Sequence, residues 1–285
     1  MPEIDSIVIQ LMNSVSLMAI LALISVGLAI IFGMMGVINL AHGEFFMLGA
    51  YTVVAVQLFV PNFWLGVVLA PIAVGLVGLV MEVSVVKRLY TRPLETLLAT
   101  WGFSIVLRQV VRIVMGPGFR QMPAPFGGQV SIFGIPYSSY RIFIIGVTVV
   151  VMLAVAYWLL RTGFGTQVRA VISNRQMAAA IGINTANADR FVFALGAGLA
   201  GLAGAIMAPL VTINPEMGIP FLARSFLVVV VGGLGSLWGV VGGGAIIGGG
   251  EGLVSFFTSA VVAQVVVLLL AILVIRIRPE GLIRR

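Results

Sequence analysis

The chain has 285 residues, of which 61% are hydrophobic and 9% are charged, with a mean hydropathy of +1.19 and a formal net charge of +7. Several apolar runs reach the ~20 residues that a helix needs to cross the hydrocarbon core of a membrane, and they are continuous, whereas barrel strands alternate. The composition predicts an all-α, polytopic transmembrane helical bundle. Because the basic residues cluster between the apolar runs, they mark topology and do not indicate nucleic acid as a partner. Without cysteine there are no disulfides and no thiolate metal sites.

About eight hydrophobic segments follow one another along the chain. They run from about Ile7 to Phe32, Phe45 to Val60, Phe63 to Val86, Thr96 to Met115, Ile142 to Leu160, Phe191 to Ile213, Ser225 to Gly250 and Phe256 to Ile275.

The charges between these segments predict the topology. Basic residues mark the cytoplasmic side, and they are found at Lys87, Arg88 and Arg92, in the connection 161–190, and at Arg276, Arg278, Arg284 and Arg285. The N-terminus carries Glu3 and Asp5 without a basic residue, which fits the outside. An outside start and an inside end require an odd number of crossings, so one of eight segments is expected not to cross fully.

The first connection, Gly33 to Glu44, interrupts the apolar pattern and holds three polar residues, Asn39, His42 and Glu44. An ionisable group at membrane depth costs at least ~2.5 kcal/mol on insertion scales, so its default interpretation is a functional one. One hypothesis is that the trio lines the substrate path or a gate. The alternative is that Asn39 and His42 satisfy free backbone groups at the interruption. His42 is the only histidine, which leaves no histidine-rich metal site.

Two features of the middle of the chain are predicted to be structural. Arg108 and Arg112 lie one helical turn apart, and their long side chains are expected to reach the membrane interface. The connection 116–140 contains Pro117, Pro123, Pro125 and Pro136 and is expected to be an irregular external loop.

The polar connection, residues 161–190, predicts a docking element. It carries four arginines against one acid, Asp189, and contains a helix-prone stretch of Ala, Met and Gln that Gly182 can end in the left-handed conformation. A short basic helix between two apolar segments is expected to lie on the cytoplasmic surface and to dock into another protein as a coupling helix. The residues of this predicted coupling helix are Arg175, Gln176, Met177, Ala178, Ala179, Ala180, Ile181 and Gly182.

The seventh segment is the predicted site of a broken or re-entrant helix. Gly232, Gly233 and Gly235 lie near its middle, and glycine costs about 1 kcal/mol per residue in a helix interior. Paired interruptions in two halves of a transporter are typical of inverted repeats. A weak internal match supports this, since placing Glu44 on Glu251 also aligns Gly43 with Gly250.

Motifs for catalysis are missing from the sequence. Lys87 is the single lysine and no glycine loop precedes it, so the chain has no Gly-x-x-x-x-Gly-Lys-Ser/Thr loop for ATP. It also lacks a Gly-x-Ser-x-Gly elbow and a His-Glu-x-x-His helix. The chain is therefore not expected to be an enzyme.

Four stretches together resemble the LivH-type permeases, the membrane subunits of bacterial importers for branched-chain amino acids that are driven by ATP-binding cassette (ABC) ATPases. Close relatives in this family import urea and short amides. The stretches are 36–44 (GVINLAHGE), 174–184 (NRQMAAAIGIN), 232–236 (GGLGS) and 278–282 (RPEGL). Residues 92–102 look more like the urea and amide members, whereas 213–215 look like the amino-acid members, so the substrate stays open between the two.

The resemblance implies the fold and the partners. It implies a single permease domain over 1–285, in the bacterial inner membrane, with 161–190 as a cytoplasmic coupling loop and 116–140 as an external loop. It also implies two cytoplasmic ATPase subunits that bind ATP and magnesium, a second homologous permease or a second copy of this chain, and an external solute-binding protein. This chain itself is expected to hold no cofactor. Gln176 stands where many related loops carry an acid, which leaves packing or a hydrogen bond for contact with the ATPase.

Three classes of function compete. The favoured class is the permease subunit of an ATP-driven importer, which transports nothing without its ATPase. The alternative is a secondary carrier or passive channel for a small neutral solute, with Glu44 as a proton site, which would transport without nucleotide. An intramembrane enzyme or scaffold is the third, and no set of catalytic residues supports an enzyme.

Overall fold

The computed structural model describes residues 4–90, 92–132 and 134–283, and the described chain is mostly helical. The α-helices are α1 (Ile4–Met35), α2 (His42–Phe59), α3 (Phe63–Ser84), α4 (Pro93–Met115), α5 (Ser139–Arg161), α6 (Gly163–Ser173), α7 (Arg175–Ala180), α8 (Thr185–Met207), α9 (Gly218–Gly232), α10 (Leu237–Gly244), α11 (Gly250–Phe257) and α12 (Ala260–Ile277). Short 3-10 helices η1 (Val86–Arg88) and η2 (Ala208–Leu210), a π-helical turn η3 (Ala245–Gly249) and strands β1 (Gln129–Ile132) and β2 (Ile135–Ser138) complete the structure.

The predicted all-α polytopic bundle is confirmed. Seven helical stretches of the described chain are long and apolar enough to cross a membrane, namely Asp5–Met35, Phe63–Arg88, Pro93–Met115, Ser139–Arg161, Thr185–Leu210, Leu237–Phe257 and Ala260–Ile277. α9 is apolar but shorter. α2 is not among the seven, because its His42, Glu44 and Gln57 lower its hydropathy.

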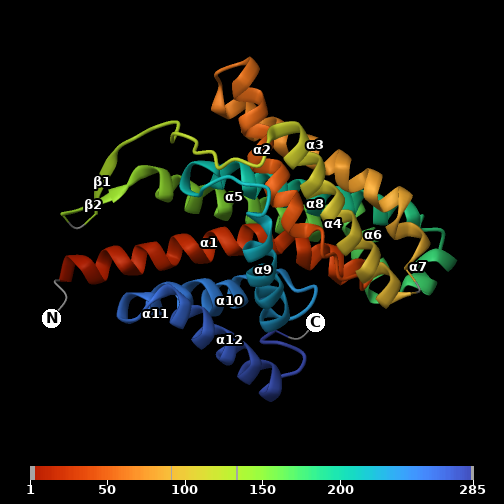
Figure 1. Ribbon diagram of the computed structural model, residues 1–285. Helices are drawn as coiled ribbons and strands as arrows, with labels where there is room; N and C mark the ends of the chain where they lie inside the picture. Colours follow the sequence, from red (N-terminus) through yellow and green to blue (C-terminus); the bar gives the residue numbers. More distant parts are fainter. Residues whose placement is uncertain (1–3, 91, 133, 284–285) are drawn as a thin grey trace.

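Glycines allow α8 to pack at the centre of the bundle (Figure 1). A Cβ on Gly49 of α2 would collide with the carbonyl of Gly201 on α8, and a Cβ on Gly201 would collide with Val74 of α3. Gly204 lies equally close to the carbonyl of Phe46 on α2. Small residues are the usual means by which membrane helices approach closely enough for extensive van der Waals contact. By contrast, α4, α5 and α12 leave most of their surface exposed at the periphery, as lipid-facing helices do.

Two reciprocal glycine contacts relate the halves of the chain. Gly27 of α1 packs against Gly196 of α8, and each would collide with the carbonyl of the other if it gained a Cβ. Gly43 of α2 and Gly218 of α9 make the same reciprocal contact. The pairs hold α1 against α8 and α2 against α9. The internal repeat suggested by the match of Glu44 with Glu251 stays a prediction.

The predicted helix break in the seventh segment is confirmed. α9 ends at Gly232, and Gly233 and Gly235 adopt φ values of +112° and +80° before α10 begins at Leu237. These left-handed conformations are accessible to glycine at little cost, which explains why the break falls at this cluster.

The break separates two antiparallel helices and does not merely interrupt one. Gly239 of α10 packs on Gly232, and Gly243 packs on the carbonyl of Val228, one turn earlier in α9. The stretch predicted as one segment, 225–250, is therefore a hairpin. If α2 and α9 also cross the membrane, they bring the seven candidate spans of the described chain to an odd number. An N-terminus outside and a C-terminus inside are then possible without a segment that crosses only in part. Of the charges used in that argument, Glu3, Arg284 and Arg285 lie outside the described residues.

The prediction that the connection 116–140 is an irregular loop was wrong in part, because it contains two paired strands. β1 and β2 form an antiparallel hairpin in which Val130 pairs with Tyr137 and Ile132 with Ile135. Gly134, at φ +85°, lies in the turn between them. The hairpin lies beside the beginning of α1, where the hydroxyl of Tyr137 donates to Asn13 (3.3 Å).

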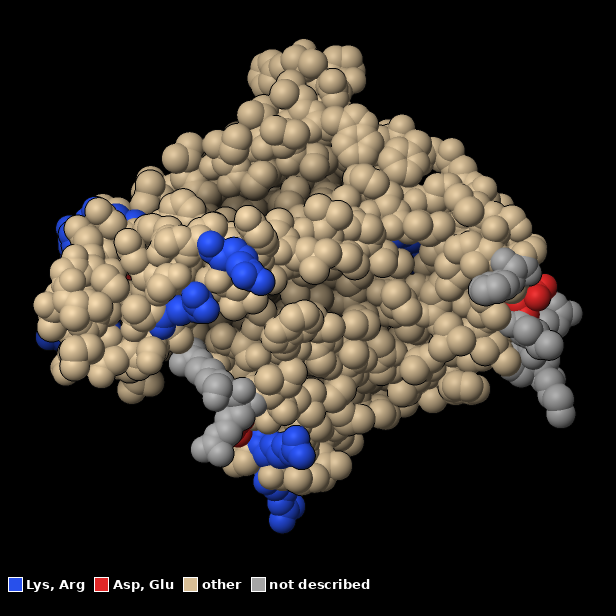
Figure 2. Space-filling model, turned by 180° about the vertical axis from the view of Figure 1, so that it is seen from behind, with Lys and Arg blue, Asp and Glu red and all other residues tan. Residues whose placement is uncertain are grey.

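The polar connection 161–190 lies at the end of the molecule opposite the hairpin (Figure 1). It contains α6 as well as the predicted short helix, α7. Figure 2 shows basic side chains gathered at this end and over the C-terminal part, while most of the surface between them carries no charge. Such a broad uncharged surface suits contact with lipid.

Candidate functional site

α7 is a short helix whose two ends are fixed by hydrogen bonds from its own sequence. The side chain of Asn174 accepts from the backbone N–H of Met177 (2.9 Å), which caps the first turn. At the other end Gly182 has φ +90°, and the amides of Gly182 and Ile183 each donate back into the last turn at 3.0 Å. This is the Schellman arrangement that ends helices at a glycine. A helix was predicted from about Arg175 to Ile181, ended by Gly182, and the structure confirms it within one residue as Arg175–Ala180. Its role as a coupling helix stays a prediction.

Arg175 fixes α7 to the start of α8. Its guanidinium donates two hydrogen bonds to the carboxylate of Asp189, with Nη1 at 3.1 Å from Oδ1 and Nη2 closer still to Oδ2. The Asp189 side chain is fully buried, whereas that of Arg175 is 40% exposed. The hydrogen bonds with Asp189 raise the pKa of Arg175 above its ordinary value. Arg175 therefore holds the helix in place and does not project from it.

A second group of polar contacts attaches α7 to α3 as well. The guanidinium of Arg175 lies over the ring of Tyr90, 5.3 Å from its centre. Tyr90 donates its hydroxyl to Glu82 of α3 at 2.7 Å, and Glu82 lies 3.9 Å from the guanidinium of Arg190 on α8. Burial raises the pKa of Tyr90 far above its ordinary value, so the hydroxyl stays protonated and remains a donor. α7 is thus linked to two long helices of the bundle.

The outward face of α7 is small and apolar. Met177 and Ile181 lie four residues apart, on one face of the helix, with 60% and 69% of their surfaces exposed. Gln176, Ala179 and Ala180 are exposed beside them, whereas Ala178 is buried against the bundle. Exposed apolar side chains at helical spacing in a polar segment are typical of a helix that docks into a groove of another protein.

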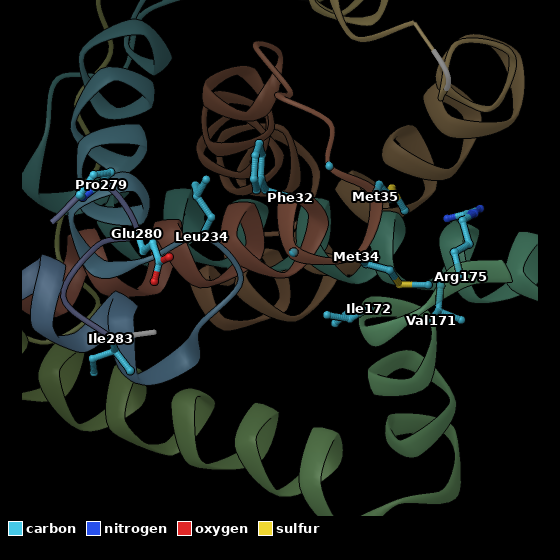
Figure 3. A pocket seen from close by; sticks show the side chains of 12 residues that line it. Phe32, Met34, Met35, Val171, Ile172, Arg175, Leu234, Pro279, Glu280 and Ile283 are labelled. Carbon is cyan, nitrogen blue, oxygen red and sulfur yellow. The ribbon is translucent and has the colours of Figure 1, made fainter. Parts of the chain in front are cut away.

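A cavity of about 640 Å³ opens next to α7. It lies between the end of α1, α6, the glycine break and the C-terminal tail, residues 278–283 (Figure 3). Met34 and Val171 lie on one side, Leu234 and Pro279 on the other. Any movement of α7 that α6 follows would change the width of this cavity, because Val171 and Ile172 of α6 are part of its wall.

The tail contacts the glycine break directly. The amides of Leu282 and Ile283 donate to the carbonyls of Val231 and Gly232 at 2.9 and 3.2 Å. The end of a helix leaves carbonyls without intrahelical partners, and the tail satisfies two of them. The stretches 232–236 and 278–282, far apart in the sequence, are therefore parts of one structure.

Comparison with known proteins supports these findings. The model of the family of permease components of branched-chain amino acid transport systems matches residues 10–276. The chain is 31% identical to the branched-chain amino acid transport system permease protein LivH of Escherichia coli K12, over 97% of this chain and 95% of that protein. It is 30% identical to the corresponding protein BraD of Pseudomonas aeruginosa, over 100% and 98% of the two chains. No solved structure matches the chain significantly.

The chain belongs to this permease family. The resemblance stated from four short stretches is confirmed over nearly the full length of the sequence. The permease is a multi-pass protein of the inner membrane, a subunit of an ABC importer and not an enzyme. It is also 26% identical to LivM of Salmonella typhimurium, another permease protein of such a system, over 77% of this chain.

The structure places the predicted trio of the permease at the first interruption, fully or almost fully buried. Asn39 accepts from the amide of Ala41 (3.0 Å), and the Nε2 of His42 donates to the carbonyl of Ile24 (3.0 Å). Both contacts satisfy backbone groups, which was the structural alternative. Whether Asn39, His42 or Glu44 contacts solute stays a prediction.

Glu44 has a partner that the sequence did not suggest. Its Oε1 lies 3.2 Å from the Nε of Arg108 on α4, and only 3% of the Glu44 side chain is exposed. Arg112 likewise pairs with Glu216 at 2.7 Å. The prediction that both arginines extend to the membrane interface was therefore wrong for Arg108, whose partner Glu44 is buried. For Arg112 it stays a prediction, because its side chain and that of Glu216 are 43% and 61% exposed.

Sequence reasoning also missed α6 in the permease. Thr162 caps it by accepting from the amide of Gly165 (3.0 Å), and Gly165, Val168 and Val171 form its buried face at helical spacing. The signal was a threonine cap followed by apolar residues three apart. It was hidden by two glycines in the first turn.

Proposed function

We propose that this permease imports branched-chain amino acids, driven by ATP hydrolysis on two partner ATPase subunits, and that α7 is the helix on which the ATPase acts. One observation carries the proposal. α7 combines an exposed apolar face at Met177 and Ile181 with rigid attachment to the bundle through Arg175 and Asp189. A docking helix needs both properties, because a force on a loosely attached helix would not reach the membrane segments.

The contacts of α7 suggest how such a force would be transmitted. Movement of α7 is passed to α8 through the ion pair of Arg175 with Asp189, and to α3 through Tyr90 and Glu82. α8 is the central helix, packed through glycines against α1 and α2. Closely packed interfaces pass on small shifts without absorbing them. A displacement of α7 would therefore shift α8 relative to α1 and α2.

The relatives support the substrate and the partners that we propose. The names of LivH and BraD specify branched-chain amino acid transport, and neither name mentions urea or amides. The similarity to LivM supports a second, homologous permease in the assembly. An external solute-binding protein would then supply most of the specificity, and ATP with magnesium would be bound by the ATPases alone.

The test is co-purification of the permease with the ATPase subunits from its own cell, followed by uptake of leucine, urea and acetamide in proteoliposomes with the binding protein. Ala179→Glu introduces a charge into the exposed face of α7. Ala124→Glu, an identical change at an exposed site in the connection between α4 and β1, is the matched control. We expect Ala179→Glu to abolish association and ATP-dependent leucine uptake, and Ala124→Glu to leave both unchanged.

Other outcomes would contradict separate parts of the proposal. Transport without nucleotide by the chain alone would support a carrier or channel in its place. ATP-dependent uptake of urea or acetamide without leucine would overturn the substrate. Normal association of the Ala179→Glu variant would show that the ATPase binds elsewhere.

A further inference from the structure

A second cavity, of about 250 Å³, lies between α9, α11 and α12, at a distance in sequence from every residue discussed above as a solute contact. These helices lie next to one another in the C-terminal half (Figure 1). The apolar part of its wall includes Leu227, Ile247 and Val267, and the polar part is Arg224, Glu251 and Gln264. We call it the α9–α12 cavity.

The polar part of the cavity holds one charge of each sign. Arg224 of α9 and Glu251 of α11 form an ion pair at 2.9 Å, with 23% and 10% of their side chains exposed. The Arg224 guanidinium also lies 6.0 Å from the centre of the Phe221 ring. A guanidinium has five N–H donors, so one carboxylate oxygen does not exhaust it. The pair can accept further polar partners without separating.

The surroundings make a purely lipid-facing role for these groups costly. Gln264 is exposed on α12, and the residues beside it, Val261, Val265 and Leu268, are exposed and apolar. Lipid cannot satisfy an amide or a partly open ion pair. This spot therefore requires water or protein against it, and a solute path would supply the water.

We propose that the α9–α12 cavity binds the substrate as an amino-acid zwitterion, with the carboxylate on Arg224, the ammonium on Glu251 and the branched side chain against Leu227, Ile247 and Val267. This inference rests on the proposed substrate class. A zwitterion brings one charge of each sign to a site that holds one of each, so every charge in the cavity has a partner. Urea and short amides are neutral, and urea has no alkyl group while acetamide has only a methyl group, so they match the charged part of the wall poorly and fill little of the apolar part.

The experiment purifies the permease with its ATPases but without the solute-binding protein, which would otherwise set the apparent affinity, and measures the Kd for leucine. Uptake by the complete transporter in proteoliposomes is measured in parallel at saturating leucine. The variants are Arg224→Gln, Glu251→Gln and the double variant with both changes. The control is Arg112→Gln, which removes the charge from a more exposed ion pair outside the cavity, that with Glu216. Leucinamide, which lacks the carboxylate, and 4-methylpentanoate, which lacks the ammonium, serve as competitors.

We expect each single variant to raise the Kd of the permease for leucine at least tenfold, and the control to change it less than twofold. Leucinamide should compete poorly with leucine for the wild-type protein. The double variant separates binding from folding, because it leaves no unpaired charge and should restore the yield and thermal stability that either single variant loses, yet still fail to transport leucine efficiently.

Three results would overturn this inference. If the double variant folds and binds leucine with the wild-type Kd, the ion pair is structural and the proposed function still stands. If both competitors inhibit wild type as strongly as leucine, the site does not recognise a zwitterion. If the wild-type transporter imports no branched-chain amino acid at all, the proposed function fails together with this site.

Discussion

The backbone amide of Leu282 donates to the carbonyl of Val231 at 2.9 Å, which joins the C-terminal tail to the end of α9. The tail can approach this closely because two glycine backbones are in contact next to the hydrogen bond. Gly281, at φ +85°, lies against the backbone of Gly233, which is itself at φ +112°. The tail therefore completes the glycine break, and the cavity beside α7 is walled by both.

We predict that Gly281→Ala destabilises the permease. A Cβ there would meet the Cα of Gly233, and a left-handed conformation costs an L-residue about 1–2 kcal/mol. The midpoint of thermal unfolding in detergent should fall by several degrees. Gly146→Ala in α5 is the control, since a Cβ there meets nothing within 4 Å and alanine favours a helix. Equal stability of the two variants would show that the tail does not hold this position in solution.

The ion pair under α7 leads to a second prediction. Arg175→Ala leaves the buried carboxylate of Asp189 without its partner. Breaking a fully buried pair costs about 3–5 kcal/mol. Because Arg175 is 40% exposed, water can replace part of the interaction, and we expect on the order of 1–2 kcal/mol. Proteolysis within 161–190 should also become faster as α7 loosens.

A double-mutant cycle tests that reasoning. Adding Asp189→Asn to Arg175→Ala removes the unpaired charge, so the double variant should be more stable than Arg175→Ala alone. Arg169→Ala on α6, whose guanidinium contacts Thr166 on the exposed surface, should change neither stability nor proteolysis. Additive effects of Arg175→Ala and Asp189→Asn would mean that the pair contributes nothing.

Local signals predicted α7 and the glycine break well. Asn174 and Gly182 define the helix ends through contacts within a few residues, and Gly233 and Gly235 stand where the backbone needs positive φ. Such features depend on neighbouring residues only, so a single sequence contains them.

Contacts between distant residues were not predictable in the same way. Nothing near Glu44 indicates Arg108, which lies on another helix, and nothing near Gly233 indicates the tail. The hairpin of α9 and α10 was missed because hydrophobicity is the same for one long interrupted helix and for two antiparallel helices. The direction of the chain after the break is decided by packing such as that of Gly239 on Gly232.

The packing of α8 supplies a third prediction. Gly204→Ala places a Cβ against the carbonyl of Phe46, so α2 and α8 must move apart. Overpacking of a close core typically costs about 1–3 kcal/mol. We expect a lower yield of folded protein and a lower unfolding temperature. Gly102→Ala in α4, where a Cβ meets nothing within 4 Å, is the matched control and should resemble wild type. Wild-type stability of Gly204→Ala would indicate that the helices lie further apart than described.

The trio at the first interruption gives the last prediction. Asn39 and His42 each satisfy a backbone group, so Asn39→Ala and His42→Ala should lower stability and reduce uptake in proportion to the folded protein lost. Each of the three side chains has one buried polar atom without a hydrogen-bond partner, namely Nδ2 of Asn39, Nδ1 of His42 and Oε2 of Glu44. Glu44 differs because it is the acid of the trio, and its Oε1 faces Arg108. A carboxylate oxygen left open inside a transporter is the atom of the trio most suited to a solute or a coupled proton. Glu44→Gln should therefore reduce leucine uptake per folded molecule severalfold, whereas Glu95→Gln, at an exposed site on α4, should not. Wild-type uptake by Glu44→Gln at matched expression would remove Glu44 from the path and leave it a structural partner of Arg108.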